Sequence, residues 1–259
     1  MLYIIAISLL LILLIFTIIS NKKRVIKSKE KVFVPNHWHN ILRDNVLFYQ
    51  KLTEKEQQLF REKMSRFLAT VHIRAIKFKI EELDTLLVAA SAVIPVFRFS
   101  SWHYTNLTTV LIYPDYFDDN LQFDAKVTHR NIGGLVGTGR FENQMILSRK
   151  ALHHGFHNKT DKGNTAIHEF IHLIDKSDGV IDGIPEVLLD KQYTIPYLQL
   201  IHKKIEEINN DDSDIRNYGG TSEIEFLAVA GEYFFERPKL MQRKHPDLYK
   251  MLASCFFKV

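Results

Sequence analysis

Hydrophobic and polar side chains recur along this chain with periods that predict both helices and strands. Residues 51–71 carry apolar side chains every three or four positions, from Phe60 to Val71, which is typical of an amphipathic helix. Thr53 and Glu56 have the spacing of a capping box at its beginning. The pattern therefore predicts a helix that packs one face against a core.

The rest of the pattern predicts a small sheet and a larger set of helices. The expected elements are a strand over 76–80, a buried helix over 81–94, a strand over 109–114, and a strand that passes into a short helix over 144–152. Residues 131–141 are glycine-rich but lack the lysine and the following helix of a phosphate-binding loop, so we expect a turn between strands. From Asn164 onward the pattern is mostly helical. These elements predict an α+β fold, with a small β-sheet beside a mainly helical bundle.

The first twenty residues form a separate apolar segment. They carry no charged side chain, and Leu2 to Ile19 is long enough to cross a bilayer as a helix. No basic region precedes the segment and no small-x-small site follows it, so a cleaved signal peptide is disfavoured. Lysines and an arginine cluster after it, over 22–31, which favours a single-pass cell-membrane protein with its following domain in the cytoplasm.

Composition narrows the remaining possibilities. Hydrophobic residues make up 46% and charged residues 25% of the 259-residue chain, which is typical of a globular domain. The net charge is +4, and no basic face with interleaved aromatic residues indicates direct nucleic-acid binding. We expect an anchor over 1–20, a charged linker over 21–35 and one domain over 36–259. Cys255 is the sole cysteine, so a cysteine-based zinc site is excluded.

The segment AIHEFIHLID, residues 166–175, contains the spacing H-E-x-x-H. His168 and His172 lie four residues apart, so on a helix both imidazoles face the same side. Neutral imidazoles are good zinc ligands, and Glu169 beside them could take a proton from a metal-activated water. The surrounding apolar side chains make an unpaired histidine or glutamate costly. The segment therefore predicts two ligands and a base of a catalytic zinc site, which lacks a third ligand.

Several residues could supply the third ligand. An extended motif would need a histidine at position 178, which is Asp178, and this arrangement is disfavoured. A second group of histidines, His153, His154 and His157, lies in a stretch that we expect to be a polar loop. Glu225 and Glu232 are seven residues apart, on nearly the same face of an apolar helix, and one carboxylate would complete a His2Glu site.

Each of these acidic or aromatic residues also has a simpler interpretation. Glu225 follows Ser222 with the spacing of a capping box, and Glu232 could be solvated or could contact a metal-bound histidine. Asp175 could orient a ligand imidazole or cap local structure. Tyr218, considered alone, is an ordinary half-buried aromatic residue.

Four segments together resemble a known family. They are LTEKEQQLFREKMSRFLATVH, TVLIYPDYF, NTAIHEFIHLID followed by DGIP, and the stretch from Tyr218 to Glu236. Over most of residues 45–245 the chain resembles the Mlc titration factor A family of gluzincin-like, zinc-dependent peptidases, whose catalytic core is similar to that of anthrax lethal factor. The resemblance implies a zincin-like metallopeptidase domain.

The resemblance also implies roles for particular residues. His168, His172 and Glu225 would bind one zinc ion per chain, Glu169 would act as general base, and Tyr218 would assist catalysis. The expected protein is a membrane-anchored metallopeptidase that acts on short peptides, with aminopeptidase action as one form. The alternative is a regulatory binding protein that sequesters a transcriptional repressor or another partner, because the best-known member of the family binds such a repressor.

Overall fold

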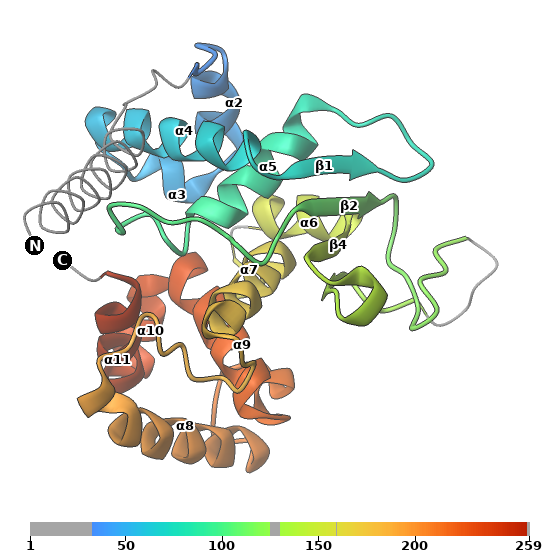
Figure 1. Ribbon diagram of the computed structural model, residues 1–259. Helices are drawn as coiled ribbons and strands as arrows, with labels where there is room; N and C mark the ends of the chain where they lie inside the picture. The colour runs from blue at the N-terminus through green and yellow to red at the C-terminus, as the bar shows by residue number, and fades with distance from the viewer. Residues whose placement is uncertain (1–32, 125–129, 159, 258–259) are drawn as a thin grey trace, which may run out of the picture. The chain divides into compact units, whose positions relative to one another are not determined.

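The computed structural model describes residues 33–124, 130–158 and 160–257. From Val34 onward the chain forms one compact unit. Helices predominate in it, and the strands gather into one small sheet (Figure 1). The α+β architecture predicted from the sequence is therefore confirmed at this level.

Four described strands form a mixed sheet in the order β1-β2-β4-β3. Their bounds are β1 His72–Ala75, β2 Thr109–Tyr113, β3 Gly134–Val136 and β4 Gln144–Ser148. β1, β2 and β4 are parallel, and β3 pairs antiparallel with β4 at the sheet edge, with Gly134 opposite Leu147. The parallel strands are largely buried at β2 and β4, as expected for a sheet covered by helices.

One predicted strand and one predicted turn differ from the structure. The strand expected over 76–80 is absent at these described residues. The strand in this part of the chain is β1, which stops at Ala75, and Lys77 adopts a left-handed φ of 62°, which is incompatible with a regular strand. The glycine-rich segment 131–141 is not only a turn, since it contains β3. The strands predicted near 109–114 and 144–148 are confirmed.

The chain before Asn164 supplies the first group of helices. They are α2 Trp38–Asn45, α3 Leu47–Gln50, α4 Glu54–Leu68, α5 Glu82–Val93 and α6 Arg149–His157. The Thr53 side chain accepts from the Glu56 backbone amide while the Glu56 carboxylate accepts from Thr53, so the predicted capping box begins α4. α5 is apolar on almost every side and packs against α4, α6 and α7 (Thr165–Asp175) in the core.

The C-terminal half is helical, as predicted. Besides α7 it contains α8 Thr194–Asn209, α9 Glu223–Glu236, α10 Pro238–Lys244 and α11 Pro246–Phe256, with short 3-10 turns η1 Gly139–Phe141, η2 Lys176–Asp178, η3 Lys191–Tyr193 and η4 Asn217–Gly220 along the chain. α7 and α9 pack closely at the centre of Figure 1. A β-carbon at Gly231 of α9 would lie 2.3 Å from Cδ1 of Ile171, so glycine allows this close approach.

The predicted single-pass location in the cell membrane is not upheld. Within the residues that the structure describes, every helix is too short or too polar to cross a bilayer. The apolar segment 1–20, on which the prediction rested, lies outside the described residues, as does most of the charged linker 21–35.

Candidate metal centre

α7 presents the residues of the H-E-x-x-H segment. The helix begins after Asn164, whose side chain accepts from the backbone amide of Ile167, and its apolar side chains anchor it in the core. His168 and Glu169 are buried and His172 is half-buried. The sequence expectation of a buried helix that carries polar groups toward one side is confirmed.

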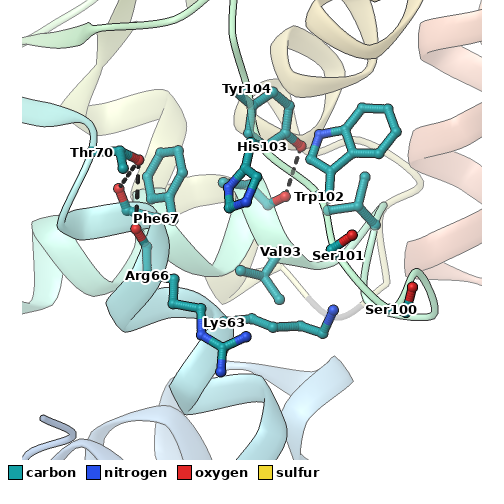
Figure 2. Close-up of a pocket in the computed structure, with 12 residues that line it drawn as sticks. Lys63, Arg66, Phe67, Thr70, Val93, Ser100, Ser101, Trp102, His103 and Tyr104 are labelled. Atoms are coloured by element: carbon teal, nitrogen blue, oxygen red, sulfur yellow. Dashed lines mark hydrogen bonds between the residues drawn. The ribbon is translucent and has the colours of Figure 1, made fainter. Parts of the chain in front are cut away.

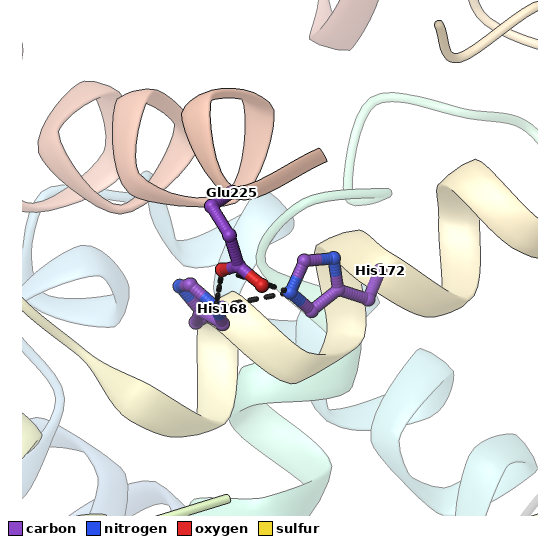
Figure 3. A group of neighbouring side chains, drawn as sticks. All are labelled: His168, His172 and Glu225. Atoms are coloured by element: carbon purple, nitrogen blue, oxygen red, sulfur yellow. Dashed lines mark hydrogen bonds and ion pairs between the residues drawn. The ribbon is translucent and has the colours of Figure 1, made fainter. Parts of the chain in front are cut away.

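Glu225 lies against both imidazoles from the first turn of α9 (Figure 3). Its Oε2 is 3.1 Å from Nε2 of His168 and 3.5 Å from Nε2 of His172, and the two Nε2 atoms are 3.0 Å apart. The Ser222 cap also forms, since its side chain accepts from the Glu225 backbone amide. The two interpretations of Glu225 are therefore compatible, because capping uses its amide and leaves its carboxylate to the histidines.

This donor set fits a zinc ion. Two imidazole nitrogens and one carboxylate oxygen lie within 4.8 Å of one another. Ligands about 2.0–2.1 Å from a tetrahedral ion are roughly 3.3 Å apart, close to the separations found between these atoms. His168, His172 and Glu225 are the residues that could hold the metal, and they leave a fourth position for water or substrate.

Glu232 lies behind His168, away from the converging atoms. Its Oε1 is 2.8 Å from Nδ1 of His168, and it also accepts from Arg216 Nη2. Its other oxygen accepts from the Asn164 backbone amide. Because Nδ1 of His168 donates its N–H to this carboxylate, Nε2 is the ring atom that faces Glu225 and His172, and it could bind a metal ion once its own proton has left. The two candidate glutamates therefore occupy different positions: Glu225 faces the Nε2 atoms of both histidines, and Glu232 contacts Nδ1 of His168.

The carboxylates around His168 determine its protonation. Burial disfavours its charged form, but hydrogen bonds with Glu225 and Glu232 outweigh burial and raise its pKa to about 10. Burial would raise the pKa of Glu225, yet the two histidines hold it well below its usual range. A positive charge is therefore stabilised at this point of the fold, and a metal cation could replace the proton.

The side chain of Glu169 lies against Gly134 of the edge strand β3. Burial raises its pKa above the ordinary range, and the nearby histidines oppose that change only in part. Its carboxylate lies so close to Gly134 that no β-carbon fits there. A glutamate in this environment is suited to accept a proton near neutral pH.

Two hollows adjoin the site, of ≈ 380 and ≈ 220 Å³. Both are lined by Gly134, His168, Glu169 and Tyr218. The Tyr218 side chain is half-exposed on η4, and its ring stacks on that of His168 with centroids 6.0 Å apart. Burial and the Glu225 carboxylate raise the pKa of Tyr218 to about 12, so its hydroxyl keeps its proton and can donate it in a hydrogen bond.

Asp175 contacts the backbone of a nearby turn. Its Oδ2 accepts from the Gly183 backbone amide at 2.9 Å, and within the described residues it forms no hydrogen bond with a ligand imidazole. Burial raises its pKa to about 6. Of the two interpretations left open by the sequence, these contacts favour support of the turn before Ile184.

The upstream histidines lie elsewhere. His153, His154 and His157 are on α6 and not in the loop that was expected. His153 Nε2 is 2.6 Å from the buried carboxylate of Asp84, which is a contact within the core of the fold. Sequence reasoning missed Arg216 and Gly134, because their contacts with Glu232 and Glu169 depend on how distant segments pack.

A buried helix that offers two imidazoles and a glutamate, faced by a carboxylate from a second helix, is the arrangement of a metallopeptidase. The chain belongs to the family described as glucose-regulated metallo-peptidase M90, whose family model matches residues 19–257. The family membership predicted from the sequence is confirmed, while the similarity to anthrax lethal factor stays a prediction.

Individual relatives match along most of their length. The uncharacterized protein slr2042 of Synechocystis sp. is 29% identical over 238 residues, which cover 86% of this chain and 84% of that protein. Mlc titration factor A of Pectobacterium atrosepticum is 23% identical over 242 residues, covering 89% and 88%. The protein of the same name from Yersinia enterocolitica is 25% identical over 230 residues, covering 85% and 84%.

Proposed function

We propose that this chain hydrolyses peptide bonds as a zinc-dependent peptidase, with one zinc ion held by His168, His172 and Glu225. The observation that carries the proposal is the convergence of two Nε2 atoms and one carboxylate oxygen at separations of 3.0–3.5 Å. The hydrogen bond from His168 Nδ1 to Glu232 supports it, because it fixes the tautomer that a ligand needs.

The residues around the ion divide the chemistry. When bound, zinc would polarise the scissile carbonyl and lower the pKa of a water molecule. Glu169 accepts the proton of the attacking water and passes it to the leaving amine, a role suited to its raised pKa. The Tyr218 hydroxyl donates a hydrogen bond to the oxyanion of the tetrahedral intermediate. Glu232 and Arg216 hold His168 in orientation from behind.

The substrate binds in the hollows on either side of these groups. β3 lies at the sheet edge, and all three of its residues line the smaller hollow, so an extended peptide can run beside it. The finer proposal is aminopeptidase action on short peptides. Free aminoacyl anilides and their N-acetylated counterparts distinguish it from endopeptidase action, since an aminopeptidase requires the free amine.

The names of the relatives favour a second function, binding of a protein partner. Several are called Mlc titration factor A, which indicates a regulatory role for those proteins. We propose as the alternative that this chain sequesters a transcriptional repressor or similar regulator, with hydrolysis secondary. Partner binding would then survive the loss of turnover.

Glu169→Gln tests the catalytic proposal. The variant keeps the shape of the side chain but removes the base, so peptide hydrolysis falls to background while zinc content stays at the wild-type level. Glu206→Gln on the exposed side of α8 is the matched control and retains activity. Full activity in Glu169→Gln would contradict the mechanism, whereas an inactive wild type that binds a repressor would favour the alternative.

A further inference from the structure

A second cavity lies apart from the metal centre, between α4, the end of α5 and residues 100–104 (Figure 2). It encloses ≈ 80 Å³, and none of its lining residues also lines the hollows beside His168. A cavity needs about 10–15 Å³ to hold one water, so this cavity has room for several waters or one small organic molecule. Nothing in the proposed reaction uses it.

The charged side chains around this cavity are both positive. Lys63 and Arg66 lie about one turn apart on α4, and no acidic residue lines the cavity. Within the described residues neither forms an ion pair, and Glu62, one turn before Arg66, instead accepts from Gln58. The Lys63 ammonium donates to the Phe99 carbonyl, and burial together with the charge of Arg66 lowers the pKa of Lys63. Two adjacent cations, one of them half-buried, favour an anion between them.

The rest of the lining combines apolar side chains, such as Val93, with the polar residues Thr70, Ser100, Ser101 and His103. Phe67 and Val93 are buried and form the floor. Figure 2 shows the charged ends of Lys63 and Arg66 on one side of Val93 and the indole of Trp102 on the other. The indole N–H is buried and has no hydrogen-bond partner among the described residues. A ligand with an anionic end and a short apolar body matches these walls.

The cavity is in contact with the helix of the metal centre. The ring of Phe170 on α7 packs edge-on against Phe67, with centroids 5.7 Å apart, and lies 5.2 Å from the ring of Tyr104. Asn106, just beyond this segment, donates to the carbonyl of Leu173 on α7. Phe170 directly follows Glu169, so these ring contacts connect the lining of the cavity to the segment that carries the base.

We propose that this cavity is an effector site for a small carboxylic acid with a short apolar or aromatic body, bound by Lys63 and Arg66. The binding claim stands on the cavity alone, whereas the effect on turnover rests on the proposed peptidase function. The same chemistry is offered by a free acid and by the C-terminal residue of a peptide. The small volume favours the free acid.

Calorimetric titration of the full-length chain tests binding without any activity assay. Benzoate is the probe, benzamide is its neutral counterpart of the same shape, and N-acetyl-leucine represents a peptide C-terminus. We expect benzoate to bind with a Kd of about 1 mM and benzamide at least about tenfold more weakly. Equal binding of benzoate and benzamide, tighter binding of N-acetyl-leucine, or no heat from benzoate overturns the proposal.

Variants locate the site. Lys63→Met and Arg66→Met each weaken benzoate binding about tenfold, Lys63→Arg retains it, and the exposed Lys55→Met on the same helix changes nothing. Binding that is unaffected by Lys63→Met and Arg66→Met overturns the site. The Glu169→Gln chain binds benzoate like wild type, so a failure of the peptidase assay and a failure of this site are distinguishable. In the active chain, benzoate changes kcat at concentrations that fill the cavity, and an unchanged kcat overturns the effector role.

Discussion

Gly134 leaves the room that the carboxylate of Glu169 occupies. A β-carbon at residue 134 would lie 2.6 Å from Cγ and Oε1 of Glu169 and 2.9 Å from its Cδ. Carbon atoms in contact are ordinarily about 3.5–4.0 Å apart, so Gly134→Ala forces a movement. β3 is held by its pairing with β4, and the side chain of Glu169 is therefore the part that yields.

In the alanine variant, Glu169 must overcome a strain free energy to return to its position in the wild-type structure, and this free energy sets the expected loss of kcat. Overfilling a packed position costs about 1–3 kcal/mol. Since each 1.4 kcal/mol corresponds to about a tenfold change in rate, displacing the base lowers kcat on the order of 10- to 100-fold. Zinc content stays unchanged, because Glu169 is not among the three converging ligands.

Gly133→Ala is the matched control. Its β-carbon would lie 3.0 Å from Cβ of Ala151 and 3.2 Å from the ring of Tyr116, so it is also tightly packed but does not meet Glu169. Neither glycine has a positive φ, so alanine is acceptable to both backbones. The measurements are kcat for a peptide substrate, zinc content and the urea midpoint of each variant. The reasoning is refuted if Gly134→Ala keeps full kcat, or if both variants lose kcat equally.

Three further substitutions test separate parts of the account. Tyr218→Phe removes the oxyanion donor and lowers kcat on the order of 10²-fold with little change in KM; a change confined to KM would contradict this role. Glu232→Gln weakens the orientation of His168 and lowers zinc affinity about 10- to 100-fold in competition with a chromophoric chelator, whereas unchanged affinity would exclude the positioning role. Burial opposes the charge of Asp84, but hydrogen bonds with His153 and an arginine hold its pKa below the ordinary value. Its contribution to stability is therefore present above about pH 4 and is lost as the pH falls through the lowered pKa. The urea midpoint of wild type then drops more steeply in acid than that of Asp84→Asn, and parallel curves would refute the assignment.

Local signals predicted the helices well, because their determinants lie within a few residues. The Thr53–Glu56 capping box began α4 as expected, and the apolar run after Glu81 gave α5. The strand over 76–80 was misplaced because alternation alone does not reveal the left-handed turn at Lys77. β3 was missed because glycines weaken the strand pattern, and only pairing with β4 makes this segment a strand.

Within the site, too, the residues fixed by local sequence could be predicted, and those that depend on packing between helices could not. His168 and His172 could be predicted because one helix fixes their spacing. Glu225 and Glu232 could not be distinguished by period, since seven residues place both on nearly one face, and their difference depends on how α9 crosses α7. Arg216 carried no local signal at all, because its contact with Glu232 exists only after η4 packs beside α9.

Zinc content of the purified full-length chain tests the central claim most directly. The measurement is metal per chain for wild type, Glu225→Ala, Glu232→Ala and the exposed control Glu206→Ala. The account predicts stoichiometric zinc in wild type and the control, loss in Glu225→Ala, and weakened retention in Glu232→Ala. A wild type without zinc, or loss of zinc in Glu232→Ala but not in Glu225→Ala, would contradict it.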